Sequence, residues 1–353
     1  MPDPGAGGPR QAAGRHPPGA NMHAGAALAC ERSLISPHPI RRETRMTASP
    51  TLEVAIAAAD RALFPGFRPF RQAANGVEIA GVIGGSGPPL LLLHGHPQSH
   101  VIWHKVAREL AREHTVVATD LRGYGASSKP AGSATHVEYS KRAMAQDQVD
   151  VMRALGFERF GLCAHDRGAR VAHRLCVDHA GRVERAMLLD IAPTLAMYEQ
   201  TDMAFAAAYW HWFFLIQPAP FPETLIHATP DFYIGKLMGL RHAGLAPFAP
   251  EAMAAYAAAM REPACVHAMC EDYRAAATID LEHDRADRAA GRRIAVPLRV
   301  LWGQHGVIQR CFEPLALWRA VAEDVSGGTV PCGHYVPEEA PDALLAEMRA
   351  FFG

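Results

Sequence analysis

The sequence predicts an α/β fold, in which a mostly parallel sheet has helices on both faces and carries an inserted helical cap. Short apolar runs alternate with amphipathic segments from Val77 onward, a pattern typical of parallel strands joined by helices. The alternation stops over residues 195–290, where alanine, methionine and aromatic residues recur at helical spacing. We therefore expect the α/β core in residues 49–194 and 291–353, with 195–290 as the cap. The 353 residues, 49% of them hydrophobic, suffice for a large buried core.

Residues 1–48 differ from the rest of the chain in composition. Gly, Pro, Ala, Arg and His dominate this stretch, and neither a helical nor a strand period persists in it. We expect a disordered N-terminal extension. Ordinary amphipathic sequence begins after Met46, so Met46 is a second candidate for the natural first residue.

Charge and cysteine content exclude several classes of protein. The 35 Lys and Arg residues nearly balance the 36 Asp and Glu residues, and no basic block is present, so neither nucleic acid nor a membrane is an expected partner. The seven cysteines form no CxxC pairs or regular spacings, which argues against a disulfide framework or a zinc site. No apolar run approaches 18 residues. We expect a soluble, cytoplasmic protein without a metal or other cofactor.

Six short apolar runs are the expected strands of the parallel sheet. Each has the length of a buried strand and is bounded by turn residues or by an amphipathic segment. They are Leu90–Leu93, Thr115–Thr119, Phe160–Cys163, Ala186–Leu189, Leu298–Trp302 and Gly328–Val330.

The third of these runs leads into the string AHDRG (164–168), which has the form small-x-Asp-x-Gly, and a helix is expected over Val171–His179. This pattern resembles the nucleophile elbow of α/β-hydrolases, a strained strand-to-helix turn that places its central side chain in the active site. Asp166 is the central residue, and Ala164 stands where a glycine is usual. A carboxylate that attacks a saturated carbon leaves an ester that water can cleave, so Asp166 favours chemistry at sp3 carbon over acyl transfer. The alternative is an aspartate that only caps the helix.

The string HGHP (94–97) follows the first expected strand and resembles the HGxP segment that supplies half of an oxyanion hole in the same fold. The backbone N–H groups of His96 and of Arg167, the residue directly after the nucleophile, would form that hole. Taken alone, the string is equally well a Gly-Pro turn after a buried strand.

His334 lies between the last expected strand and a final amphipathic helix, where this fold carries its general base. Two positions compete for the acid that orients the base, one after the sixth strand of the fold and one after the seventh. The seventh-strand position is Gly306, whereas the sixth strand ends in Asp190. We therefore assign the acid to Asp190, which gives the chain order nucleophile, acid, base. A turn-forming aspartate is the alternative.

Three strings resemble those of the fluoroacetate dehalogenases, a family of the α/β-hydrolase fold. They are HDRGAR (165–170), YWHW (209–212) and CEDYR (270–274). The resemblance extends from about Leu52 to the C-terminus and includes Asp190 and His334. It implies SN2 attack by Asp166 on the halogen-bearing carbon, followed by hydrolysis of the ester by water that His334 activates. Fluoroacetate would then give glycolate and fluoride, and relatives of this kind suggest a homodimer.

The resemblance also implies binding roles for five further residues. Arg167 and Arg170 lie three apart at the start of a helix, so their guanidinium groups can hold a substrate carboxylate over the nucleophile and offset the repulsion between the two anions. His211, Trp212 and Tyr273 would donate hydrogen bonds to the leaving halide. Without the resemblance, the arginines would be expected on an exposed helix turn and the aromatic side chains in the interior of the cap.

His96 departs from the family pattern, which has phenylalanine at this position, and it leaves open whether fluoride, chloride or bromide is preferred. An epoxide hydrolase with the same nucleophile is one alternative, because the cap offers tyrosines that could polarise an epoxide oxygen. These are Tyr209, Tyr233, Tyr256 and Tyr273. A non-catalytic binding protein on the same fold is another, and an acyl esterase is disfavoured because position 166 holds neither Ser nor Cys. The expected partners are a small haloacid and water.

Overall fold

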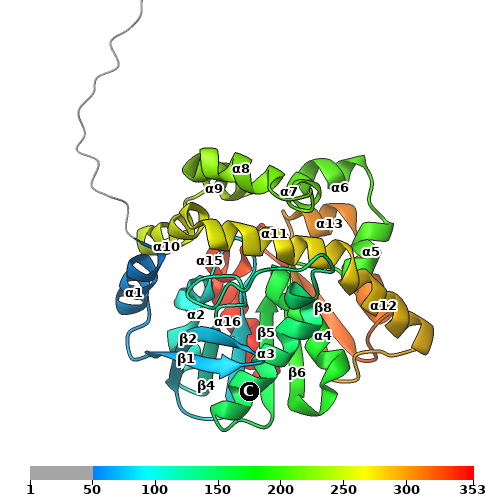
Figure 1. Ribbon diagram of the computed structural model, residues 1–353. Helices are drawn as coiled ribbons and strands as arrows, with labels where there is room; N and C mark the ends of the chain where they lie inside the picture. The colour runs from blue at the N-terminus through cyan, green and yellow to red at the C-terminus, as the bar shows by residue number, and fades with distance from the viewer. Residues whose placement is uncertain (1–50) are drawn as a thin grey trace, which may run out of the picture. The chain divides into compact units, whose positions relative to one another are not determined.

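The computed structural model describes residues 51–353 (Figure 1). Its centre is an eight-stranded sheet in the order β1-β2-β4-β3-β5-β6-β7-β8. The strands from β4 to β8 in this order are parallel, and β1 and β2 add an antiparallel hairpin at one edge. The predicted α/β fold with a mostly parallel sheet is confirmed. The prediction for residues 1–48 lies outside the described residues.

Each of the six predicted apolar runs lies within a strand, whereas β1 and β2 were not predicted. The strands are β1 (Arg68–Ala74), β2 (Val77–Gly85), β3 (Pro89–Leu93), β4 (Thr115–Thr119), β5 (Phe160–His165), β6 (Val183–Leu189), β7 (Leu298–Gly303) and β8 (Val325–Val330). Four consecutive buried leucines fill β3, because a central strand covered on both faces buries every side chain rather than alternate ones. β6 begins before the predicted Ala186, because the exposed Glu184 and Arg185 interrupt the apolar run while the strand continues.

Helices cover both faces of the sheet. α3 (Lys141–Ala154) packs with α4 (Asp166–Asp178) on one face, and α2 (His104–Leu110) packs with α16 (Pro341–Phe352) on the other (Figure 1). α4 begins at Asp166, so the predicted start at Val171 is wrong. The first turn of α4 is polar and carries no apolar period, although all its side chains are buried. The remaining helices outside the insert are α1 (Leu52–Leu63), α13 (Val307–Cys311), α14 (Pro314–Arg319) and α15 (Val336–Glu339).

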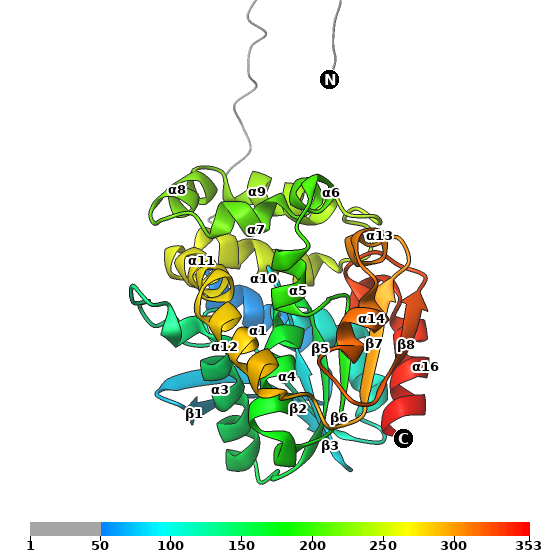
Figure 2. The same ribbon diagram turned by 90° about the vertical axis from the view of Figure 1, so that its right-hand side faces the viewer.

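A helical insert, α5 to α12, connects β6 to β7. In Figures 1 and 2, α7, α8 and α9 lie above α10 and α11, which cross over the end of the sheet where β5 leads into α4. The insert comprises α5 (Thr194–Glu199), α6 (Met203–Ala208), α7 (Trp210–Leu215), α8 (Phe221–Ala228), α9 (Pro230–Gly239), α10 (Pro250–Arg261), α11 (Pro263–Ala277) and α12 (Ile279–Ala290). Within residues 51–353 we find no helix with the length and apolar character that a bilayer crossing requires.

Candidate active site

Asp166 lies at a sharp turn between β5 and α4. Its φ angle is 45°, in the left-handed region that a non-glycine residue rarely adopts, and its side chain is buried. Two glycines make room for this turn. A Cβ at Gly95 would stand 2.7 Å from the Asp166 Oδ2, and a Cβ at Gly168 would stand 2.3 Å from the His94 carbonyl oxygen. The strained turn therefore presents the carboxylate at the carboxyl edge of the sheet, where functional side chains of α/β sheets converge.

One oxygen of the Asp166 carboxylate is already held. The backbone N–H of His96 donates to Oδ2 at 2.9 Å, whereas Oδ1 accepts no hydrogen bond from the described residues. The backbone N–H of Arg167, the second predicted donor, makes no bond to the carboxylate in this state. Oδ1 is thus the oxygen free to react, and Oδ2 is the oxygen beside an N–H donor.

Asp190 and His334 form a buried pair beside this turn. The His334 Nδ1 lies 2.5 Å from the Asp190 Oδ2, and the Asp190 Oδ1 accepts from the backbone N–H of Gly303 at 3.0 Å. The carboxylate therefore fixes the imidazole ring and leaves the other ring nitrogen, Nε2, for chemistry. His165 also contacts the pair, since its Nε2 lies 2.8 Å from the backbone carbonyl oxygen of His334.

The charges around Asp166 keep it ionised. Burial alone would raise the pKa of Asp166, but its electrostatic interactions with the neighbouring His334 and His165 and with the charged Arg170 and Arg167 hold it below its ordinary value. A deprotonated carboxylate is the form that can act as a nucleophile.

The two arginines at the start of α4 are buried and only partly satisfied. Arg167 binds Asp272 through Nε at 2.8 Å and Nη2 at 3.0 Å, while its Nη1 has no partner. Arg170 donates from Nη1 to Thr194 at 2.9 Å, and its Nε has no partner. Each guanidinium therefore retains one buried nitrogen without a hydrogen-bond partner near Asp166. An anionic ligand would satisfy both, because an unpaired buried donor is costly.

Three further donors without partners belong to the same group of buried side chains as Asp166 and the two arginines. His211 Nδ1, Trp212 Nε1 and the Tyr273 hydroxyl are all buried and all unpaired within the described residues. Contacts with the arginines hold two of these rings in place. The Arg167 guanidinium lies 4.1 Å above the Tyr273 ring, and that of Arg170 lies 4.6 Å from the Trp212 ring. The structure thus brings the predicted residues from α4, α7 and α11 into one buried cluster.

The protonation states of these donors suit hydrogen bonding. Burial, together with the nearby Arg241 charge, lowers the pKa of His211 well below its usual value, so the ring is neutral. Burial and the facing Asp166 charge raise the pKa of Tyr273 well above its usual value, so the hydroxyl keeps its proton. Both groups can therefore donate without carrying charge.

Sequence reasoning missed two charged residues near the cluster. Asp272 binds Arg167 and also accepts from the Tyr124 hydroxyl at 2.7 Å and from Lys141. Its only signal was its place beside Tyr273 in the string CEDYR. Arg241 follows α9, and its guanidinium lies 4.9 Å from the Tyr209 ring, with no carboxylate bound to it in the described part of the chain. Arg241 could not be predicted, because an isolated arginine in a loop belongs to no sequence motif.

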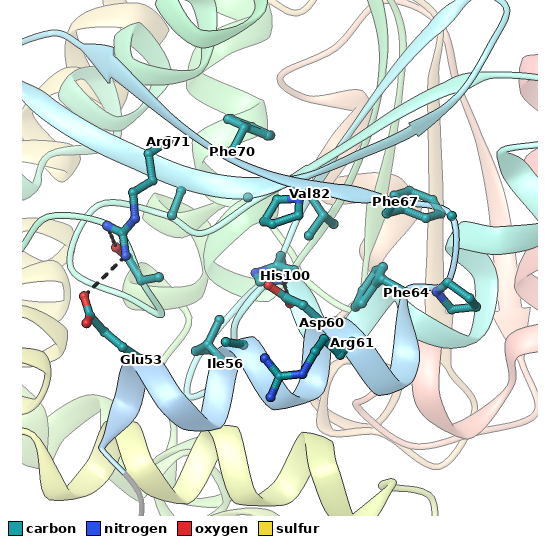
Figure 3. A pocket seen from close by; sticks show the side chains of 17 residues that line it. Glu53, Ile56, Asp60, Arg61, Phe64, Phe67, Phe70, Arg71, Val82 and His100 are labelled. Carbon is teal, nitrogen blue, oxygen red and sulfur yellow. Dashed lines mark hydrogen bonds and ion pairs between the residues drawn. The ribbon is translucent and has the colours of Figure 1, made fainter.

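A cleft of about 690 Å³ lies between α1 and the β1–β2 hairpin, and none of the predicted site residues lines it (Figure 3). His100 forms part of its wall between two carboxylates, at 2.9 Å from Asp120 and 2.8 Å from Asp60. Burial opposes protonation of His100, but these carboxylates raise its pKa to about 10. Because both of its ring nitrogens are paired, His100 offers no unsatisfied donor to this cleft, in contrast to the side chains around Asp166.

Comparisons with known proteins find relatives that match most of this chain. The family model described as the alpha/beta hydrolase fold matches residues 88–306. A fluoroacetate dehalogenase from a Burkholderia species is 46% identical over 290 residues, which cover 82% of this chain and 95% of that protein. A soluble epoxide hydrolase from Corynebacterium sp. strain C12 is 32% identical and covers 79% of this chain and 94% of its own. A solved structure described as an α/β hydrolase from Nostoc sp PCC 7120 is 53% identical, with a TM-score of 0.80, covering 82% of this chain and 99% of that one.

Proposed function

This chain belongs to the fluoroacetate dehalogenase family of the α/β-hydrolase fold and hydrolyses carbon–halide bonds, and we propose that it converts fluoroacetate to glycolate and fluoride. One observation carries this proposal. A buried, ionised carboxylate lies in one cluster with two arginines and three neutral side chains, all of which keep a nitrogen or hydroxyl without a partner among the described residues. A small molecule with a carboxylate at one end and a halogen at the other would satisfy both sets.

The first step is attack by the free Oδ1 of Asp166 on the carbon that bears the halogen. The new C–O bond forms as the C–F bond breaks, and fluoride leaves with the electron pair. The unpaired nitrogens of Arg167 and Arg170 hold the substrate carboxylate and screen it from the Asp166 charge. His211, Trp212 and Tyr273 donate to the departing fluoride and so replace hydrogen bonds that water would give it in solution.

The second step hydrolyses the ester. His334 takes a proton from water through Nε2, and the resulting hydroxide attacks the carboxyl carbon of Asp166. Negative charge develops on Oδ2, beside the N–H of His96, with the N–H of Arg167 as the second donor of the oxyanion hole. When this tetrahedral intermediate collapses, the bond between the Asp166 carboxyl carbon and the glycolate oxygen breaks, the glycolate oxygen takes the proton from His334, and the restored Asp166 carboxyl group releases the second proton to solvent. Asp190 stabilises the protonated His334 until that transfer. The sum is fluoroacetate plus water giving glycolate, fluoride and a proton, with no cofactor in either step.

The helical insert acts as the cap in this proposal, since it supplies three of the halide donors and covers the carboxyl edge of the sheet (Figure 1). Arg241, also from the insert, adds a third positive charge near the pocket. Its charge contributes to the lowered pKa values of His96 and His211, so it lies within electrostatic range of both rings. We assign it the attraction of anionic substrates toward the site.

The test is a fluoride-electrode assay of the full chain on fluoroacetate, with Asp166→Asn as its partner. Wild-type protein should release fluoride and glycolate in equal amounts, and Asp166→Asn should release neither while keeping the same thermal midpoint within a few degrees. Turnover by Asp166→Asn, after deamidation has been excluded by mass spectrometry, would contradict the assignment of the nucleophile.

Epoxide opening is the second candidate. The Corynebacterium relative and the unpaired hydroxyls of Tyr233 and Tyr273 favour it, because cap tyrosines could polarise an epoxide oxygen. The arginine pair argues against it, since a neutral epoxide leaves both guanidinium groups unsatisfied. A panel of styrene oxide, epichlorohydrin and cyclohexene oxide beside fluoro-, chloro- and bromoacetate separates the two functions.

A further inference from the structure

The side chain of His96 is buried without any hydrogen bond. It is 4% exposed, and among the described residues it is the one histidine whose two ring nitrogens are both buried and unpaired. A neutral imidazole has one N–H donor and one acceptor, and leaving both unsatisfied is costly. The position therefore indicates a ligand rather than a packing role, for which an apolar ring would suffice.

The surroundings of His96 show which ligand it would contact. Its ring centroid lies 5.2 Å from that of Tyr273, in an edge arrangement, and 6.3 Å from that of His211, with the two ring planes nearly parallel. Its backbone N–H holds Oδ2 of Asp166. The His96 ring therefore lies beside two of the proposed halide donors, while its main chain lies against the nucleophile.

The ring is uncharged at neutral pH. Burial is the main cause that lowers the pKa of His96, to about 3, with Arg167 and Arg241 acting in the same direction and Asp166 and Asp272 opposing. A neutral ring can donate one hydrogen bond without adding charge to the pocket.

We propose that the His96 side chain is a fourth hydrogen-bond donor to the leaving halide and that it favours release of fluoride over chloride. The proposal rests on the dehalogenase function proposed above. Fluoride is the smaller anion and depends more on close donors, so the loss of one donor should slow C–F cleavage more than C–Cl cleavage. The ring N–H polarises the departing fluoride and keeps its own proton, so the atoms and charges of the first step do not change.

The test compares halide release in a single turnover, with enzyme in excess, so that the same bond-breaking step is measured for fluoroacetate and chloroacetate. His96→Phe keeps an aromatic ring against Tyr124 and Tyr273 but removes both nitrogens. We expect it to slow fluoride release by about tenfold or more and chloride release by less than about threefold, the size of one charge-assisted hydrogen bond. His96→Gln, which restores an N–H donor, should recover at least half of the lost preference on a logarithmic scale.

His114→Phe is the matched control, because His114 is also buried with an unpaired ring nitrogen. It lies just before β4, at the amino end of the strand, whereas Asp166 lies at the carboxyl end of the sheet. His114→Phe should leave the fluoride-to-chloride ratio unchanged. An unchanged ratio in His96→Phe, or equal slowing of both halides, would overturn the role of His96. If His96→Phe does not fold, His96→Leu against His96→Gln makes the same comparison. Failure of the proposed function is distinct, since wild-type protein would then release neither halide.

Discussion

Gly306 lies directly against the carboxylate of Asp190. A Cβ at position 306 would stand 3.1 Å from the Asp190 Oδ1 and 3.7 Å from Oδ2. The two positions that compete for the orienting acid in this fold, at the ends of β6 and of β7, therefore converge on one place beside His334. A carboxylate at both would bring two like charges together, which explains why only one of them is acidic.

A carboxylate at position 306 should consequently be able to replace that of Asp190 in orienting His334. Asp190→Asn should lower kcat for fluoroacetate by about 10⁴-fold, because the imidazolium of His334 loses its counter-charge. Adding Gly306→Asp to that variant should recover at least about tenfold, since φ at Gly306 is −81° and suits any residue. Gly306→Asp alone should be slower than wild type. Steady-state fluoride release from the three variants shows whether an acid at position 306 can replace Asp190. A double variant no faster than Asp190→Asn would refute the equivalence of the two positions.

His334→Ala should separate the two chemical steps. Attack by Asp166 needs no base, whereas hydrolysis of the ester does, so this variant should release one fluoride per active site and then stop. Intact-mass spectrometry should find the carboxymethyl ester on Asp166, and Asp166→Asn should show neither burst nor adduct. Continued turnover at the wild-type rate would remove His334 from the hydrolytic step.

Much of this site could be predicted from the sequence, because its residues lie in short strings set by backbone geometry. Asp166 requires a strained turn with small neighbours, and the spacing of Arg167 and Arg170 follows from one helical turn. The start of α4 could not be predicted, since HDRGAR has no apolar period. Arg241 also could not, because its role depends on where the insert folds back over the sheet rather than on any neighbouring residue.

Asp272 should act as a positioning residue for Arg167. Asp272→Asn keeps the shape of the side chain but weakens the two hydrogen bonds that hold the guanidinium, so the KM for fluoroacetate should rise roughly tenfold while kcat falls less. Asp147→Asn is the matched control, because Asp147 accepts the same two hydrogen bonds from Arg122, of 2.9 and 2.6 Å, and this pair is not part of the cluster around Asp166. Both variants should lose stability, and only Asp272→Asn should change KM. Equal KM values in the two variants would reduce Asp272 to a structural role.

Arg241→Gln should slow capture of the substrate rather than the chemistry. We expect kcat/KM for fluoroacetate to fall by about three- to tenfold at low salt, and its dependence on ionic strength to become flatter, with kcat nearly unchanged. Arg159→Gln changes the same charge at an exposed position before β5 and should keep the wild-type salt dependence. The two variants are compared by measuring kcat/KM between 10 and 500 mM NaCl, where the screening length falls from about 30 Å to about 4 Å. A salt dependence in Arg241→Gln as steep as in wild type would exclude steering by this residue.

The buried neutral histidines should make the protein sensitive to mild acid. His96 and His165 have pKa values of about 3, mainly because burial disfavours their charged forms, whereas a histidine in the unfolded chain titrates near 6.5. Between these values only the unfolded state binds the proton, so the stability present above pH 6.5 is lost as pH falls, by about 1.4 kcal/mol per pH unit for each such histidine. His100 has the opposite sign, because its pKa of about 10 stabilises the folded state below that pH.

His96→Phe should therefore show a shallower loss of unfolding free energy than wild type between pH 6 and pH 4.5, a window above the titration of most carboxylates. Urea unfolding at four pH values measures the slope, and Tyr124→Phe, which alters a ring beside His96 without removing a histidine, should keep the wild-type slope. Parallel slopes for wild type and His96→Phe would mean that His96 is already protonated in the folded protein, and its role as a neutral donor would then fail as well.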